Sequence, residues 1–322
     1  MTKLVFGPVP SRRLGRSLGV NNIPPKHCSY SCIYCQVGKT AHLEVERREF
    51  YPPEDLVREI EEALSRLRGG LDYVTFVPDG EPTLDRNLGK TIRMLKSRLD
   101  VRVAVITNAS LLHLPDVRAD LGEADLVSVK VDAVTERVWR LVNRPHPAIS
   151  NNLRLDGIIR FSEEFSGTLI SETMLVSGFN DSAQEFELIG DFLARLNLHK
   201  AYIAVPIRPP AERFVRPPSE ETLIEAHEIL TSILGENKVE LLMGYEGPQF
   251  SASGDPVESL LATTSVHPMR LDYAESYLRR YGLDPREVLS RLQGDGHIAI
   301  VEYLGRQFVV RRTLRSRDSV SR

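Results

Sequence analysis

The three cysteines of this 322-residue chain lie within eight consecutive residues. They occur as Cys28-Ser-Tyr-Ser-Cys32-Ile-Tyr-Cys35, and the chain has no fourth cysteine to join them. Thiolates are soft ligands that suit iron–sulfur clusters, and a cube of four irons needs four ligands. Three protein ligands would leave one iron open to a small molecule. The expected cluster is therefore a reactive site rather than only an electron store.

Two other uses of the cysteines remain open. A structural zinc ion would need a fourth protein ligand, which His27 or His42 would supply. A disulfide would leave one thiol over, and the sequence shows no signal peptide, so we expect a reducing, cytoplasmic compartment. The chain also has no run of about 18 apolar residues, and we therefore expect no membrane span.

The C-x-x-x-C-x-x-C spacing, with Tyr34 directly before the last cysteine, resembles the signature of the radical S-adenosylmethionine (SAM) superfamily. In that superfamily the amino and carboxylate groups of SAM bind the open iron. One electron from the reduced cluster cleaves SAM and yields a 5′-deoxyadenosyl radical, which abstracts hydrogen from a substrate. The resemblance implies an enzyme with a [4Fe–4S] cluster and SAM as cofactors. It also implies a one-electron reductant, such as flavodoxin or ferredoxin, as a partner.

Beyond the cysteines, short apolar strands alternate with segments of helical periodicity. The pattern predicts strands at 17–21, 73–77, 101–107, 126–131, 168–176 and 201–206. It predicts helices at 54–68, 88–99, 134–141, 183–196 and 220–234. Such alternation indicates an α/β fold with a parallel sheet and helices on its outer face. Six β/α units resemble the (β/α)6 partial TIM barrel of radical SAM enzymes, in which the active site lies at the carboxyl ends of the strands.

Polar residues follow two neighbouring strands of this predicted sheet. The second strand leads into Gly80, Glu81 and Pro82, and the third ends at Thr107 and Asn108. A glycine allows close approach of the backbone, and a carboxylate can hold an ammonium group. The two segments resemble the Gly-Glu and Thr-Asn-Gly motifs of the superfamily, which implies contacts to the amino group and the ribose of SAM. A plain turn at Gly80 and a helix cap at Asn108 are the alternatives.

Ser128, Lys130 and Asp132 alternate with apolar residues along the fourth predicted strand, so their side chains share one face of the sheet. In a barrel that face is the interior, where a lysine needs an anionic partner. The strand resembles that of glycyl-radical-enzyme activases, which implies that it contacts SAM. A Schiff-base lysine and a structural ion pair remain open. Val176, at the end of the fifth strand, belongs to a segment that resembles the one flanking the adenine.

Arg12, Arg13 and Arg16 precede the first predicted strand. Their guanidinium groups suit phosphate or carboxylate groups in a substrate mouth, and a solvated basic turn is the alternative. Together with the cysteine loop, this stretch resembles a subgroup related to the tRNA wyosine-forming radical SAM enzymes, over roughly residues 1–250. The resemblance implies base modification in tRNA. The chain lacks the additional N-terminal cysteines that hold a second cluster in true wyosine synthases.

The end of the chain has the pattern of a separate module. Residues 247–255 are rich in Gly, Ser and Pro and predict a linker; helices at 256–261, 270–281 and 285–293 and strands at 298–303 and 307–312 follow. Three helices and a hairpin resemble a winged helix. We therefore predict a radical SAM domain at 1–250 and a winged-helix-like domain at 251–322. Residues 265–322 contain 11 Arg and no Lys against 7 acidic residues, which suits either a nucleic acid or a docked protein.

The sequence thus favours a radical SAM enzyme that modifies a base in tRNA or another RNA. Activation or modification of a protein substrate by the same radical chemistry is the second hypothesis. A zinc-binding winged-helix regulator without enzymatic activity is the third. The sequence contains no signal for an oligomeric state.

Overall fold

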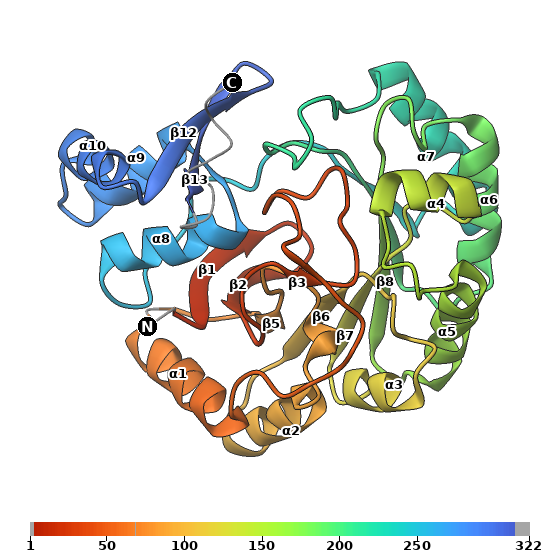
Figure 1. The fold of residues 1–322 in the computed structure, drawn as a ribbon, viewed down its shortest axis with the longest axis horizontal. Coiled ribbons are helices and arrows are strands. Elements are labelled where there is room, and N and C mark those ends of the chain that lie inside the picture. The colour runs from red at the N-terminus through yellow and green to blue at the C-terminus, as the bar shows by residue number, and fades with distance from the viewer. Residues whose placement is uncertain (1–2, 68, 313–322) are drawn as a thin grey trace.

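The computed structural model describes residues 3–67 and 69–312. Its main element is an eight-stranded sheet in the order β1-β2-β5-β6-β7-β8-β9-β10 (Figure 1). Its strands are β1 (Val5–Ser11), β2 (Gly15–Val20), β5 (Tyr73–Phe76), β6 (Val103–Thr107), β7 (Leu126–Lys130), β8 (Thr168–Met174), β9 (Lys200–Ala204) and β10 (Val239–Leu242). Strand β1 is antiparallel to β2 at one edge, and all the other neighbours are parallel.

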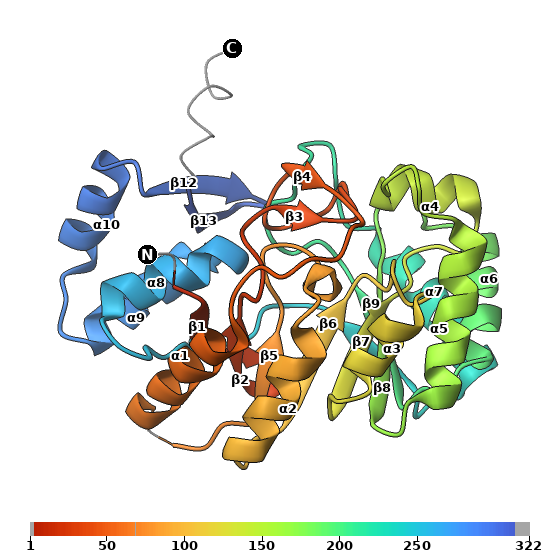
Figure 2. The ribbon, with the colours of Figure 1, turned by 60° about the horizontal axis from the view of Figure 1, so that its bottom comes forward.

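Helices cover the outer face of this curled sheet (Figures 1 and 2). They are α1 (Pro53–Arg66), α2 (Leu88–Arg98), α3 (Pro115–Leu121), α5 (Asn151–Glu164), α6 (Ala183–Ala194) and α7 (Glu220–Leu234). Their apolar faces pack on outward-facing strand residues such as Val127 and Val129 to form the main core. The predicted α/β partial barrel is confirmed. No helix in the described part of the chain is long and apolar enough to cross a bilayer.

In the barrel, the sequence-based prediction misses β1, β10, α3 and α5. Strand β1 contains Gly7, Pro8 and Pro10, which have poor strand propensity, and its pairing depends on packing against distant residues. Strand β10 has only four residues. The fifth predicted strand ends at Met174, two residues earlier than expected. The helix predicted at 54–68 ends at Arg66, and residue 68 lies outside the described residues.

The C-terminal segment forms three helices and a three-stranded antiparallel sheet. Its elements are α8 (Pro256–Val266), β11 (Met269–Arg270), α9 (Leu271–Arg280), α10 (Pro285–Gly294), β12 (Ile298–Tyr303) and β13 (Arg306–Arg311). The sheet has the order β11-β13-β12. The predicted helices and hairpin are present, and β11 is additional. The winged-helix assignment and the domain boundary after residue 250 stay predictions.

The core of this C-terminal module includes residues from the other end of the chain. Phe6 and Val9 of β1 belong to the same buried cluster as Phe250 and Leu260. Figure 1 shows α8 beside β1, with the blue C-terminal elements next to the red N-terminal strand. The segment 247–255, predicted to be a linker, is itself packed, because Phe250 is buried within it. The first strand and the C-terminal module therefore stabilise each other.

Replacement Phe6→Ala tests this shared core. Truncation of a buried Phe removes packing and leaves a cavity, which costs about 3–5 kcal/mol of unfolding free energy. We expect urea denaturation to show a loss of this size, and limited proteolysis to cleave the chain after residue 250 faster than in the wild type. Ile224→Ala on α7 is the control, because Ile224 is 57% exposed; we expect a change below about 0.5 kcal/mol. An unchanged proteolysis pattern in F6A would contradict the shared core.

Candidate active site

The cysteine loop lies at the carboxyl ends of the strands (Figure 2). Strand β3 (His27–Cys28) pairs with β4 (His42–Leu43), and a β-bridge joins His27 to Gly80, shortly after β5. All three cysteines are free and half-buried. Burial raises the pKa of each thiol, that of Cys32 to about 12. The thiols are therefore protonated at neutral pH until a metal displaces their protons.

Amide groups converge on the cysteine sulfurs. Cys28 Sγ accepts from the Tyr30 N–H at 3.5 Å and from Asn108 Nδ2 at 3.6 Å. Cys32 Sγ accepts from Asn143 Nδ2 at 3.4 Å. Hydrogen bonds to sulfur and burial are the means by which proteins stabilise and tune iron–sulfur clusters. The donors around these thiols fit such a cluster.

The histidines considered as zinc ligands have other partners. His27 Nδ1 lies 2.5 Å from a carboxylate oxygen of Glu44, and its ring stacks on that of His42 at a centroid distance of 4.1 Å. Within residues 3–67 and 69–312, no three His, Cys, Asp or Glu side chains gather around a single metal position. In a four-iron cube each thiolate binds a different iron, so the sulfurs need not converge on one point.

Glu81 ties the segment after β5 to the end of β6. Its buried carboxylate accepts from the N–H and hydroxyl of Thr83, from the Thr107 hydroxyl and from the Asn108 N–H, at 2.6–3.1 Å. Both carboxylate oxygens therefore have protein partners. Through Asn108, this arrangement also reaches the sulfur of Cys28. The contact of Glu81 with the amino group of SAM stays a prediction.

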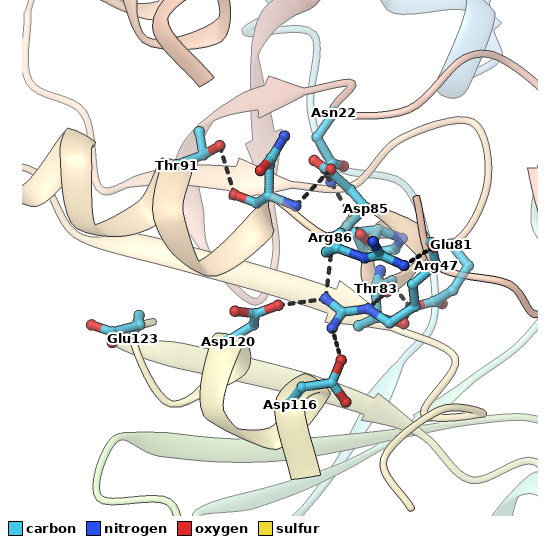
Figure 3. Close-up of polar contacts among 12 residues, drawn as sticks. Asn22, Arg47, Glu81, Thr83, Asp85, Arg86, Thr91, Asp116, Asp120 and Glu123 are labelled. Atoms are coloured by element: carbon cyan, nitrogen blue, oxygen red, sulfur yellow. Dashed lines mark hydrogen bonds and ion pairs between the residues drawn. The ribbon is translucent and has the colours of Figure 1, made fainter. Parts of the chain in front are cut away.

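A second polar network supports this segment from behind (Figure 3). Pro82 begins the short turn η1 (Pro82–Leu84). The buried guanidinium of Arg47 donates to the Thr83 carbonyl at 2.9 Å and to the carboxylates of Asp116 and Asp120 from α3. Breaking such a buried pair leaves an uncompensated charge. Arg47 therefore fixes the turn that positions Glu81.

Ser128, Lys130 and Asp132 face the barrel interior, as their alternation predicts. Lys130 Nζ lies 3.3 Å from Asp132 and 2.8 Å from Glu172 of β8. Asp132 also accepts from the Tyr34 hydroxyl of the cysteine loop. Burial lowers the pKa of Lys130, and the carboxylate of Asp132 opposes this shift. An ion-paired lysine is thus tied to the residues beside the cluster site.

Ser128 and Val176 are two further residues that the sequence predicts to contact SAM. The Ser128 hydroxyl is buried and has no hydrogen-bond partner among the described residues. Because buried hydroxyls are normally bonded, it fits a ligand hydroxyl in the interior. Val176 packs with Ile33 of the cysteine loop and with Val215 in a small apolar cluster. The contact of Val176 with the adenine of SAM stays a prediction.

The sequence does not single out Glu172 or Asn143. Glu172 shares an inward face with Ile170 and Met174 on β8, and this two-residue alternation is a readable signal. Asn143 is the last residue of α4 (Glu136–Asn143) and approaches Cys32 because that helix ends beside the cysteine loop. No local sequence pattern indicates the contact between Asn143 and Cys32.

A cavity of about 320 Å³ lies in the barrel beside Cys35. Its walls come from β1, β2 and the strands around β8, and from Val266 and His267 of the C-terminal module. Of the residues predicted to contact SAM, Lys130 alone lines it. The cavity therefore lies beside the expected SAM site rather than within it.

Comparison with known proteins gives the family. The model of the radical SAM superfamily matches residues 22–193, more than half of the chain. The chain belongs to the radical SAM superfamily. It is 43% identical to a UPF0026 protein of Methanocaldococcus jannaschii, in a match that covers 98% of both chains.

Solved structures share the fold of this radical SAM protein at low sequence identity. SuiB of Streptococcus suis bound to SAM has a TM-score of 0.52 at 15% identity, over 70% of this chain and 50% of SuiB. TYW1 with a bound lysine-pyruvate adduct has a TM-score of 0.50 at 15% identity, over 67% of this chain and 73% of TYW1. As a radical SAM enzyme the protein uses SAM and a [4Fe–4S] cluster. The hypothesis of a non-enzymatic zinc regulator is therefore wrong.

Replacement Gly80→Ala tests the seating of the cysteine loop. A Cβ at Gly80 would lie 1.9 Å from the His27 carbonyl oxygen, so the loop backbone must move. Disturbing the support of a metal site typically costs about 10–100-fold in affinity. We expect anaerobically reconstituted G80A to retain much less iron and sulfide than the wild type. Gly70→Ala is the control, because no atom lies within 4 Å of a Cβ there; full iron content in G80A would contradict the expectation.

Ser128→Ala and Ser171→Ala form a matched pair for SAM binding. Both hydroxyls are buried without a partner in the described part of the chain, but Ser128 faces the interior and Ser171 the opposite face of the sheet. We expect neither change to lower stability by more than about 0.5 kcal/mol. Loss of one hydrogen bond should weaken SAM binding to S128A alone by about 5–10-fold, measured by equilibrium dialysis of reconstituted protein. Equal SAM affinities in the two variants would argue against a contact at Ser128.

Proposed function

We propose that this radical SAM enzyme modifies an RNA base, with tRNA as its substrate class, in chemistry related to wyosine formation. In this arrangement Cys28, Cys32 and Cys35 hold the cluster, and SAM lies along the ends of β5 to β8. Bound there, the cluster and SAM supply a reductive cleavage that yields a 5′-deoxyadenosyl radical. The residues of the chain bind and orient the reactants and exclude water. A flavodoxin or ferredoxin is the proposed electron donor.

The observation that carries the proposal is the position of the C-terminal module, which borders the cavity. Val266 and His267 line the cavity, and Gln36 of the cysteine loop donates to the Val266 carbonyl at 3.0 Å. The Tyr303 hydroxyl of β12 donates to the Pro206 carbonyl at 2.9 Å, beyond the end of β9. A nucleic acid bound to this module would therefore lie close to the reacting groups.

The module also carries exposed positive charge on α10 and the hairpin. Four exposed arginines form no ion pair with any described residue: Arg286, Arg291, Arg306 and Arg312. Unpaired guanidinium groups suit phosphate oxygens. The succession of three helices and a hairpin supports the winged-helix interpretation, in which the last helix enters a nucleic-acid groove. Three more arginines, Arg315, Arg317 and Arg322, lie outside the described residues.

The fold likeness to TYW1 agrees with the resemblance of the N-terminal sequence to wyosine-forming enzymes. The chain has no cysteine left for a second cluster. The proposal therefore covers RNA base modification and does not extend to wyosine synthesis itself.

The proposal predicts that tRNA stimulates SAM cleavage. Anaerobically reconstituted protein would be reduced with dithionite and assayed for 5′-deoxyadenosine with and without bulk tRNA. We expect a several-fold stimulation that falls as salt rises, because the binding of arginines to tRNA phosphates releases counterions and therefore weakens at high salt. Arg291→Glu should make the negative slope of log tRNA affinity against log salt concentration shallower by about 1, because one phosphate contact is lost. SAM cleavage in the absence of tRNA should stay unchanged.

Arg160→Glu is the matched control for this measurement. Arg160 is exposed on α5, on the far side of the barrel from the C-terminal module in Figure 1. We expect the R160E variant to have the same tRNA affinity and the same salt dependence as the wild type. Stimulation by a protein fraction, with none by tRNA, would contradict RNA modification and support a protein substrate.

A further inference from the structure

Cys35 differs from the other two cysteines in the charge that lies beside it. Burial raises the pKa of the Cys35 thiol, and the strongest opposing influence is the charge of Lys26. At the other two cysteines the strongest charge effect comes from a carboxylate, Glu81 or Asp132, which adds to burial and raises the thiol pKa further. The charge around an iron–sulfur cluster is one of the factors that set its reduction potential. The cluster site therefore has a cation on the side of Cys35 and carboxylates on the other sides.

Lys26 is held in place by Asp79, the residue before Gly80. Lys26 Nζ lies 3.2 Å from Asp79 Oδ1, and this carboxylate forms no other ion pair within residues 3–67 and 69–312. The backbone supplies a second link, because the Lys26 N–H donates to the Asp79 carbonyl at 2.7 Å. The side chain of Lys26 is 17% exposed and that of Asp79 is 5% exposed. Solvent and salt therefore screen the charges of this pair only weakly.

The ammonium group of Lys26 also lies against the turn that follows Cys35. A Cβ placed on Gly38 would be 3.6 Å from Lys26 Nζ. The Gly38 N–H donates to the Cys35 carbonyl at 3.1 Å, which closes the turn. The cysteine and the cation are thus brought together by one short segment of the loop.

The backbone conformation of Lys26 would suit a glycine better than a lysine. Its φ of 67° lies in the left-handed region, where a Cβ is sterically unfavourable. Backbone strain of this kind persists only where the surrounding structure imposes it, and it is concentrated at functional sites. The presence of a long cationic side chain at such a position favours a role for that side chain.

The ion pair consists of two opposite charges under the conditions of an assay. Burial raises the pKa of Asp79 to about 6, and Lys26 opposes this shift. At pH 8 Asp79 is therefore ionised and partly cancels the field of Lys26. Of the two, Lys26 has the larger effect on Cys35. The net influence of the pair on the cluster site is that of a positive charge.

We propose that Lys26, held by Asp79, makes the cluster on the three cysteines easier to reduce. Reduction adds one electron to the cluster, and a fixed positive charge beside Cys35 stabilises the form that carries it. Lys26 acts through Cys35 and is a positioning residue for charge rather than a catalytic residue. The inference rests on the assignment of the cluster to Cys28, Cys32 and Cys35, and it does not depend on which substrate the enzyme modifies.

The test is a redox titration of anaerobically reconstituted full-length protein at pH 8 without SAM, followed by the electron paramagnetic resonance signal of the reduced cluster. Lys26→Asn removes the charge, and asparagine tolerates a positive φ. We expect the ratio of reduced to oxidised cluster at a fixed potential to fall by about 10-fold, because a unit charge acts on a buried site at an effective dielectric constant of about 20. Asp79→Asn should raise this ratio, since it removes the opposing charge. Lys26→Arg should leave it near the wild-type value.

Lys39→Asn is the matched control from the same loop. Lys39 follows Cys35 by four residues, but its side chain is 68% exposed, so water and salt screen its charge. We expect K39N to have the wild-type reduction potential. An unchanged or raised ratio in K26N, shifts of the same sign in K26N and D79N, or an equal shift in K39N would each overturn the proposal.

Iron and sulfide analysis would establish that each variant holds its cluster. Should K26N lose iron, a reduced-to-oxidised ratio in D79N at or below that of the wild type would overturn the proposal instead. The iron content and the resonance signal of the wild type report on the cluster itself, and no RNA is present. Failure of this proposal is therefore distinct from failure of the proposed function.

Discussion

The active site depends on a backbone contact between the cysteine loop and the segment after β5. The His27 carbonyl accepts the Glu81 N–H at 3.0 Å, and Gly80 leaves no room for a side chain between the two segments. The Glu81 carboxylate then holds Asn108, which reaches the sulfur of Cys28. One close approach therefore sets the position of the loop relative to two strands of the barrel.

Both ends of the chain cover one edge of the open barrel. An open parallel sheet leaves edge strands whose backbone groups need cover. Here β1 extends one edge of the sheet, and the C-terminal module packs on β1 and supplies two residues to the cavity wall. The β/α units of the barrel thus provide the cluster site, while β1 and the C-terminal module enclose the cavity beside it.

Most of the barrel could be predicted because its elements are continuous patterns along the chain. The alternation of Ser128, Lys130 and Asp132 also predicted correctly which way these side chains point. Strand β1 could not be predicted, since the residues that bury it lie at the opposite end of the sequence. The contact of Asn143 with Cys32 depends on where a helix ends in space, and no local spacing encodes that.

The shared core of β1 and the C-terminal module has a consequence for biosynthesis. Phe6 and Val9 leave the ribosome well before Phe250, Leu260 and the other residues that bury them, because more than 200 residues separate the two sets along the chain. The strands from β2 to β9 can pair as they emerge, but β1 keeps an uncovered apolar face until the C-terminal module has been made. Such long-lived exposed surface is prone to aggregation and is the kind that chaperones recognise. The enzyme therefore completes its reaction chamber only after the rest of its barrel has been made.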